Sequence, residues 1–312
     1  MKRARSREDL TEMTSTEDTS ANVIHGATRP DSASRPLTID PRSVSLGLLG
    51  LYLVVTALVL ANASGNAGLI VTHAALVLVV VWTLRPRSDA ARIVGDLLPL
   101  FAAPVLYGEI PALIAAAKTV YHDASIQSIE LALFGAQAAR VFAASVPNLA
   151  LSEVLHAGYM AYYPVIFFPP LLLYVRGNRR GYLETVVALT ATYLVCWLIF
   201  VVMPVEGPRY QWGPAAAAPH GPMQQFANMV LARGSSRGAA FPSSHMAVMV
   251  AQALMALRWQ RRIGLVVSFV AALVGLGAVY GGFHYATDIV AGAVLGSLIA
   301  GLCLLRFSKR AQ

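Results

Sequence analysis

The sequence predicts an all-α protein: a polytopic membrane helical bundle of about eight spans, with a core of six helices. Three observations carry this prediction. Of the 312 residues, 56% are hydrophobic and only 13% are charged, whereas soluble domains carry roughly 25% charged residues. The apolar residues fall in blocks of about 16–23, the length that crosses a bilayer core of about 30 Å. Basic residues gather in the polar segments between those blocks.

The first element is a polar segment, residues 1–43. It is rich in Ser and Thr and holds seven acidic and seven basic residues. Such a composition is typical of a disordered tail, which we expect on the cytoplasmic side. No apolar run follows the first basic cluster within this segment, so we do not expect a signal peptide.

The spans follow in order. They are expected at 44–61, 67–84, 95–117, 153–175, 183–204, 242–258, 263–281 and 286–305. The third is the least regular, because it contains three prolines and Glu109. We divide the chain into 1–43 (tail), 44–117 (additional N-terminal spans and the first core span), 118–152 (outer loop), 153–305 (membrane core) and 306–312 (cytoplasmic tail).

The distribution of basic residues predicts the orientation. With eight spans, 19 of the 24 Lys and Arg residues lie in the two tails and three loops of one side. The positive-inside rule places that side, and both termini, in the cytoplasm. We therefore expect a multi-pass protein of the cell inner (plasma) membrane. The net charge of +8 reflects this topology and attraction to anionic lipid head groups, and it does not indicate nucleic-acid binding.

Two short motifs lie at the expected outer edge of the spans. The first is Phe-Pro-Ser-Ser-His, ending at His245, and the second is Gly-Phe-His-Tyr-Ala-Thr-Asp, which contains His284 and Asp288. His284 and Asp288 are four residues apart, one helical turn on the same face. A third segment, Val-Glu-Gly-Pro-Arg-Tyr, delivers Arg209 to the same side. A histidine oriented by a carboxylate, with a second histidine nearby, suits nucleophilic attack and proton transfer at a phosphate ester.

A simpler reading exists for each histidine. A lone histidine at a membrane edge is more often an interfacial residue than a nucleophile. Both motifs and Arg209 are expected on the same side of the membrane, and this coincidence favours a catalytic role for the two histidines over an interfacial one. Cys196 and Cys303 lie inside expected spans, so neither a disulfide nor a cysteine metal site is expected.

These motifs resemble those of the type 2 phosphatidic acid phosphatase superfamily, over roughly residues 150–305. The family's motifs are Lys-x6-Arg-Pro, Pro-Ser-Gly-His and Ser-Arg-x5-His-x3-Asp. The resemblance implies a helical membrane enzyme that moves phosphoryl groups through a phosphohistidine, without a metal or another cofactor. By this resemblance the catalytic residues are His284 as nucleophile, His245 as acid and base, and Asp288 as the partner of His284.

The chain departs from the family motifs at several positions. Ser244 replaces the glycine, while Gly277 and Ala278 replace the serine and arginine of the third motif. Val202 stands where the lysine of the first motif would be, and Tyr210 follows Arg209 in place of proline. These losses resemble the branch that contains inositol phosphorylceramide synthase, an inositolphosphotransferase-like group, and sphingomyelin synthase.

Phosphoryl transfer requires charge stabilisation on the phosphate oxygens. Arg209 offers a two-pronged donor, and Ser243 and Ser244 offer hydroxyls at the start of a helix. Candidate substrate contacts are Arg237, Glu109 and His156. For Glu109 and His156 a structural role stays open. Glu109, which is costly inside a span unless it is paired, could form a structural hydrogen bond. His156 could be an interfacial polar residue.

Three classes of function remain. The first is transfer of a phospho-headgroup from a lipid to an alcohol, and the second is hydrolysis of a lipid or polyprenyl phosphate or diphosphate. The third, a non-enzymatic lipid transporter, leaves the convergent motifs unexplained. In the enzyme classes the partners are a lipid phosphate substrate and the bilayer. The sequence leaves the lipid, the acceptor and the oligomeric state open.

Overall fold

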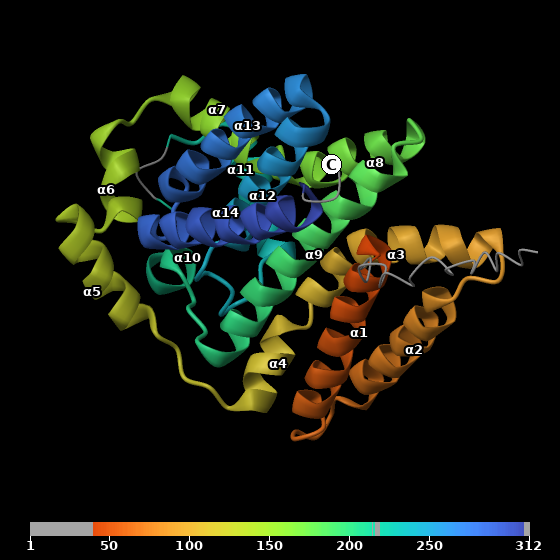
Figure 1. Ribbon diagram of the computed structural model, residues 1–312. Helices are drawn as coiled ribbons and strands as arrows, with labels where there is room; N and C mark the ends of the chain where they lie inside the picture. The colour runs from red at the N-terminus through yellow and green to blue at the C-terminus, as the bar shows by residue number, and fades with distance from the viewer. Residues whose placement is uncertain (1–39, 214, 216–218, 309–312) are drawn as a thin grey trace, which may run out of the picture. The chain divides into compact units, whose positions relative to one another are not determined.

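The computed structural model describes residues 40–213, 215 and 219–308 (Figure 1). Most of the two expected tails, 1–43 and 306–312, lies outside these residues. The described residues form helices joined by turns and short connections, which confirms the all-α prediction. The helices are α1 (Pro41–Leu60), α2 (Ala67–Leu84), α3 (Asp89–Tyr107), α4 (Ile110–Ala117), α5 (Asp123–Phe134), α6 (Ala138–Ser145), α7 (Leu149–Met160), α8 (Tyr162–Val175), α9 (Arg179–Val202), α10 (Pro208–Trp212), α11 (Pro222–Gly234), α12 (Ser244–Trp259), α13 (Arg261–Tyr280) and α14 (Ala286–Ser308).

Six of the described helices, α1, α2, α3, α9, α13 and α14, are long and apolar enough to cross a membrane. The pair α7 and α8, bent by 44°, would make a seventh span if the two count as one. The remaining expected span, 242–258, corresponds to α12, which has 16 residues. At 1.5 Å per residue α12 is about 24 Å long, somewhat less than the hydrocarbon core of a bilayer.

Two expected elements differ in detail from the observed helices. The third span, 95–117, is broken at Gly108 and Glu109 into α3 and α4. Pro111 lies in the first turn of α4, where its missing N–H costs no helical hydrogen bond. The outer loop, 118–152, contains two helices, α5 and α6. Their sequences are too short and too mixed in polarity to stand out beside the long apolar blocks.

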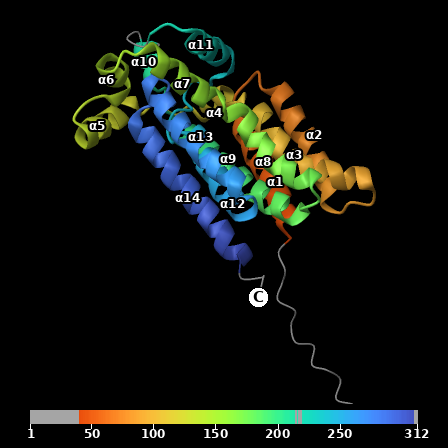
Figure 2. The same cartoon turned by 90° about the horizontal axis from the view of Figure 1, so that it is seen from above.

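The helix α12 lies at the centre of the core and packs against α9, α13 and α14 (Figure 2). Close packing against α14 is possible because Gly292 and Gly296 face α12. A Cβ at Gly292 would collide with the backbone of Ser243, and one at Gly296 with that of Ala247. Small residues at helix contacts are the usual means of close approach in membranes. They bring the beginnings of α12 and α14, which carry the two motifs, side by side.

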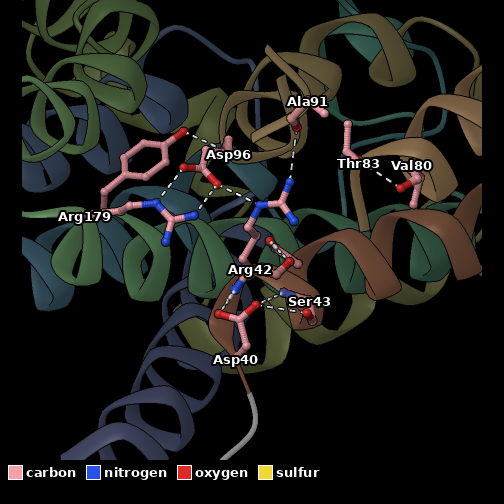
Figure 3. A network of polar contacts seen from close by, with 10 residues as sticks. Asp40, Arg42, Ser43, Val80, Thr83, Ala91, Asp96 and Arg179 are labelled. Carbon is pink, nitrogen blue, oxygen red and sulfur yellow. Dashed lines mark hydrogen bonds and ion pairs between the residues drawn. The ribbon is translucent and has the colours of Figure 1, made fainter. Parts of the chain in front are cut away.

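A buried ion cluster joins the beginnings of α1 and α9 to the first half of α3 (Figure 3). The carboxylate of Asp96, which is 1% exposed, accepts hydrogen bonds from Arg42 Nε and from Nε and one terminal nitrogen of Arg179, each at 2.8 Å. Arg42 also donates to the carbonyl oxygen of Ala91. The cluster fixes the N-terminal helices against α9, the buried helix beside α12.

Candidate active site

Backbone contacts bring the three motif segments together. Val205, the first residue of the Arg209 segment, forms an isolated parallel β-bridge with Ala239, just before the first motif. The N–H of Ser243 donates to the carbonyl oxygen of Asp288 at 3.0 Å, joining the first motif to the second. The site is therefore built from segments more than thirty residues apart in the sequence.

The predicted pair of His284 and Asp288 is formed. Nδ1 of His284 lies 3.3 Å from Oδ2 of Asp288, and the same oxygen accepts the backbone N–H of Tyr285 at 2.9 Å. Asp288 is fully buried and His284 is 5% exposed. With Nδ1–H donated to the carboxylate, Nε2 of His284 holds the lone pair that faces away from Asp288.

His245, in the first turn of α12, faces His284. The two ring centroids are 6.0 Å apart. Tyrosine rings surround His245: Tyr162 at 4.2 Å, Tyr159 at 5.3 Å in a nearly parallel stack, and Tyr163 at 6.2 Å between centroids. These rings hold the imidazole in place and shield it from solvent.

Two adjoining cavities meet at His245. The small cavity, of about 40 Å³, is lined by His245, His284, Arg209 and Glu206, together with aromatic residues, among them Tyr107 and Tyr159, and several smaller residues. The large cavity, of about 260 Å³, lies between α3, α8, α9, α11 and α12. Its walls are mainly apolar, with Ile166, Phe167 and Leu231, and include four tyrosines, Tyr107, Tyr162, Tyr163 and Tyr193.

Arg209 and Glu206 give the small cavity its charge. Arg209 is half-buried and donates two hydrogen bonds to Asn228 of α11, one to the side chain at 3.1 Å and one to the carbonyl oxygen at 3.4 Å. Glu206 accepts hydrogen bonds from Gln211 at 2.6 Å and from Arg237. The guanidinium of Arg209 is thus fixed by α11, and Arg209 lines the same small cavity as His284.

The two serines of the first motif differ in position. Ser243 is the N-cap of α12, and its hydroxyl oxygen accepts the N–H of Met246 at 3.3 Å. Ser243 does not line either cavity, whereas Ser244 lines the large one. Of the two hydroxyls predicted to bind phosphate, that of Ser243 is engaged in capping.

The three candidate substrate contacts lie outside both cavities. Arg237 is paired with Glu206, which raises the pKa of its guanidinium, and it is mostly exposed. Glu109 accepts the hydroxyl of Tyr52 at 3.2 Å and lies 3.4 Å from Nε2 of His73, so it makes the structural contact left open above. His156 donates from Nδ1 to the carbonyl oxygen of Ser152 at 2.7 Å and packs behind Phe283.

Sequence reasoning missed several residues of the site. Tyr159, Tyr162 and Tyr163 have the spacing i, i+3, i+4 of one helix face, a signal that could have been read as a tyrosine surface. Glu206 lies three residues before Arg209, and its charge could have been used to predict an ion pair with an arginine; the observed partner is Arg237. Asp123 and Glu130 carry no such signal, because Glu206 and Thr287, which they contact near the site, are more than eighty residues away along the chain.

The part of the chain that the structure describes contains no group of three or more His, Cys, Asp or Glu side chains that could hold a metal ion. The groups that can carry charge at the site include the imidazoles of His245 and His284, the carboxylates of Asp288 and Glu206, and the guanidinium of Arg209. These groups suit attack on a phosphate and transfer of protons.

The comparison with protein families agrees with this chemistry. A family model described as the PAP2 superfamily matches residues 124–302. The chain belongs to the PAP2 superfamily. This is the type 2 phosphatidic acid phosphatase superfamily, which consists of phosphatases and phosphotransferases. No curated protein and no solved structure matches the chain.

The structure explains why this PAP2 protein departs from the third family motif. Gly277 of α13 packs against α7, and a Cβ there would collide with the carbonyl oxygen of Leu155. Ala278, at the position of the family's arginine, is fully buried. A serine at 277 does not fit this packing, and without an arginine at 278 the small cavity relies on Arg209.

Proposed function

We propose that this PAP2 protein is a metal-independent lipid phosphotransferase, which moves a phospho-headgroup from a lipid to an alcohol through a phosphohistidine on His284. The observation that carries the proposal is the position of His245 between an apolar cavity and a small polar one. A lipid phosphate likewise consists of an apolar part and a polar phosphate. Its apolar part suits the large cavity, and its phosphate suits the space between His284 and Arg209.

Access from the bilayer supports a lipid substrate. Pro104 and Tyr163 line the large cavity and are also exposed on the outer surface of their helices. A lipid chain can therefore reach the cavity sideways from the membrane. The cavity walls are mainly apolar, so burial of a hydrocarbon chain there is favourable, at about 25 cal/mol for each Å² removed from water.

In the first step, Nε2 of His284 attacks phosphorus, a N–P bond forms, and the bond from phosphorus to the lipid alkoxide breaks. Protonated His245 gives its proton to the leaving oxygen. Asp288 accepts the Nδ1–H of His284, fixes the tautomer and stabilises the positive charge that develops on the ring. Arg209 stabilises the negative charge on the phosphate oxygens.

In the second step, neutral His245 takes the proton of an acceptor hydroxyl as its oxygen attacks phosphorus. The N–P bond breaks, and the electron pair returns to Nε2 of His284. Protons and charge balance over the two steps, because the proton that His245 gives to the leaving oxygen is replaced by the one that it takes from the acceptor hydroxyl. Positioned acid–base groups of this kind contribute about 10²–10⁴-fold in rate.

The charge of the small cavity supports a diester substrate. Among the described residues that line it, one guanidinium, that of Arg209, stands beside one carboxylate, that of Glu206. A phosphodiester carries one negative charge, whereas a phosphate monoester carries about 1.5 to 2 at pH 7. The shortage of cations favours a diester donor and transfer to an alcohol. Hydrolysis of a lipid or polyprenyl phosphate or diphosphate is the alternative, because water can replace the acceptor alcohol in the second step.

The test is the partition of products from purified protein in lipid vesicles. Phosphatidylinositol and phosphatidic acid serve as donors, a polyol or glycolipid alcohol as acceptor, and mass spectrometry as the readout. We expect the acceptor to gain the phospho-headgroup, and we expect EDTA to leave the rate unchanged. Free phosphate from phosphatidic acid as the main product, with added alcohols never appearing in a product, would support the phosphatase instead. Loss of turnover with EDTA would contradict metal independence.

A further inference from the structure

A carboxylate outside all three motifs connects two of them. Asp123, the first residue of α5, is 5% exposed. Its Oδ2 accepts the backbone N–H of Glu206, and its Oδ1 accepts that of Gly207, both at 2.9 Å. Oδ1 also accepts the hydroxyl of Tyr285 at 3.1 Å. Asp123 therefore bonds to the segment that leads into Arg209 and to the residue directly after His284.

The hydrogen bonds have a consistent direction. Gln127, one turn after Asp123 on α5, donates its side-chain N–H to the hydroxyl oxygen of Tyr285 at 2.8 Å. The Tyr285 hydroxyl is then free to donate its proton to Asp123. Burial raises the pKa of Tyr285 well above its usual range, so this hydroxyl stays protonated.

The position requires a carboxylate. Three donors converge on Asp123, and an ionised carboxylate accepts hydrogen bonds at both oxygens without donating any. An asparagine would turn its NH₂ group toward at least one N–H or O–H donor and lose that contact. Gly207 adds a second constraint, because its φ of +90° is a conformation that favours glycine. The route of the chain into Arg209 is thus held at two adjacent residues.

We propose that Asp123 is a positioning residue. It holds Arg209 at the distance from His284 that the transition state of phosphoryl transfer requires. This inference rests on the proposed phosphohistidine chemistry. Asp123 does not line either cavity, so it acts through the backbone of Glu206 and Gly207 and through Tyr285. Misplacement of a catalytic group by about 1 Å can cost about 100-fold in rate.

A purely structural role for Asp123 makes a different prediction. Loss of a stabilising contact lowers the fraction of folded protein but leaves the kinetics of each folded molecule unchanged. Loss of positioning lowers kcat and weakens the binding of a transition-state mimic in parallel, while KM changes little. Orthovanadate, which adopts the five-coordinate geometry of phosphoryl transfer, serves as that mimic.

The experiment compares Asp123→Asn with Asp40→Asn in the full-length protein. Asp40 is a matched control, because it also accepts two backbone N–H groups. It is the N-cap of α1, a helix that carries none of the three motifs. Vanadate affinity is measured from the rise in unfolding temperature with vanadate concentration, and kcat and KM with the donor that the wild type turns over. We expect kcat and vanadate affinity to fall about 10- to 100-fold in Asp123→Asn, with KM and the Asp40→Asn control near wild type.

A second pair of variants covers the case in which Asp123→Asn does not fold. Tyr285→Phe removes only the hydroxyl, and Tyr182→Phe is its control, since Tyr182 donates to the backbone of Asp96 at the other end of α9. We expect Tyr285→Phe to lower kcat and vanadate affinity in the same direction. In the double variant with Asp123→Asn, where that protein folds, it should add little, because both residues act through one contact.

The outcomes separate the two hypotheses. One outcome is that the wild type binds vanadate and turns over the donor, while Asp123→Asn and Tyr285→Phe show the same kcat and vanadate affinity as the wild type. This outcome would overturn the positioning role and leave the proposed function standing. Wild-type protein that neither binds vanadate nor turns over a lipid phosphate would overturn both.

Discussion

At the scale of single residues, Arg209 determines how the site handles charge. It is the guanidinium of the small cavity, fixed by two hydrogen bonds to Asn228. Lysine keeps the charge but has a single ammonium group in place of a planar fork. It cannot bond to Asn228 and to two phosphate oxygens in the same geometry.

We therefore expect Arg209→Lys to lower kcat/KM by about 100-fold, the cost of one lost transition-state donor. The measurement is steady-state turnover of the donor that the wild type uses. Arg92→Lys is the control, because Arg92 forms an exposed pair with Asp89 in the first turn of α3. Wild-type turnover in Arg209→Lys would mean that this guanidinium does not bind the reacting phosphate.

The sequence predicted which motif residues lie together better than it predicted their surroundings. His245, His284 and Asp288 stand in short motifs with fixed spacing, and the structure brings them together as expected. The contacts of Arg237, Glu109 and His156 depend on tertiary partners that local spacing does not encode. Glu109, for example, accepts the hydroxyl of Tyr52, which is 57 residues away along the chain. Ser243 instead caps α12 through a local contact with Met246.

At the scale of elements, the buried cluster of Arg42, Asp96 and Arg179 fixes α1 and α3 against α9 (Figure 3). Both Arg42 and Asp96 are almost fully buried. Removal of one partner from a buried pair leaves an uncompensated charge, at a cost of about 3–5 kcal/mol. The large cavity is lined by α3 and α9, so a loosened cluster also affects the site.

We expect Asp96→Asn to lower the free energy of unfolding by about 3 kcal/mol or more. Asp89→Asn is the matched control, since Asp89 pairs with Arg92 on the surface, and exposed pairs contribute about 0–1 kcal/mol. The measurement is denaturant or thermal unfolding in detergent. Equal stability of the two variants would contradict a supporting role for the cluster.

Elements were predictable where the apolar blocks were long. The boundaries of α1, α2, α9, α13 and α14 follow the blocks closely. The breaks within α3–α4 and α7–α8, and the helices α5 and α6, were not predicted. They depend on packing against the core, as when Glu130 of α5 accepts the N–H of Thr287 at the start of α14.

At the scale of the whole molecule, the distribution of basic residues predicts that the site faces outward. The end of α6 lies on the side of the site, because the carbonyl oxygen of Val146 accepts the hydroxyl of Tyr280 at the end of α13. Arg87 lies between α2 and α3, in one of the basic loops expected in the cytoplasm.

We expect Ser145→Cys to react with a membrane-impermeant maleimide in intact cells, and Arg87→Cys to react only after lysis. Both positions are exposed. The background carries Cys196→Ala and Cys303→Ala, which removes the two native cysteines. The reverse labelling pattern would place His245 and His284 in the cytoplasm.

The central claim is a covalent intermediate on His284, and its most direct test is mass spectrometry of the protein quenched at alkaline pH during turnover. With a phosphodiester donor, we predict that His284 carries the phospho-headgroup, because the N–P bond forms as the lipid alcohol leaves. The modification should be absent from His284→Ala. In His245→Ala it should form more slowly, because the first step lacks its acid, and once formed it should decay more slowly, because the second step lacks its base. Turnover without any adduct on His284, or an adduct on His245 instead, would contradict the mechanism.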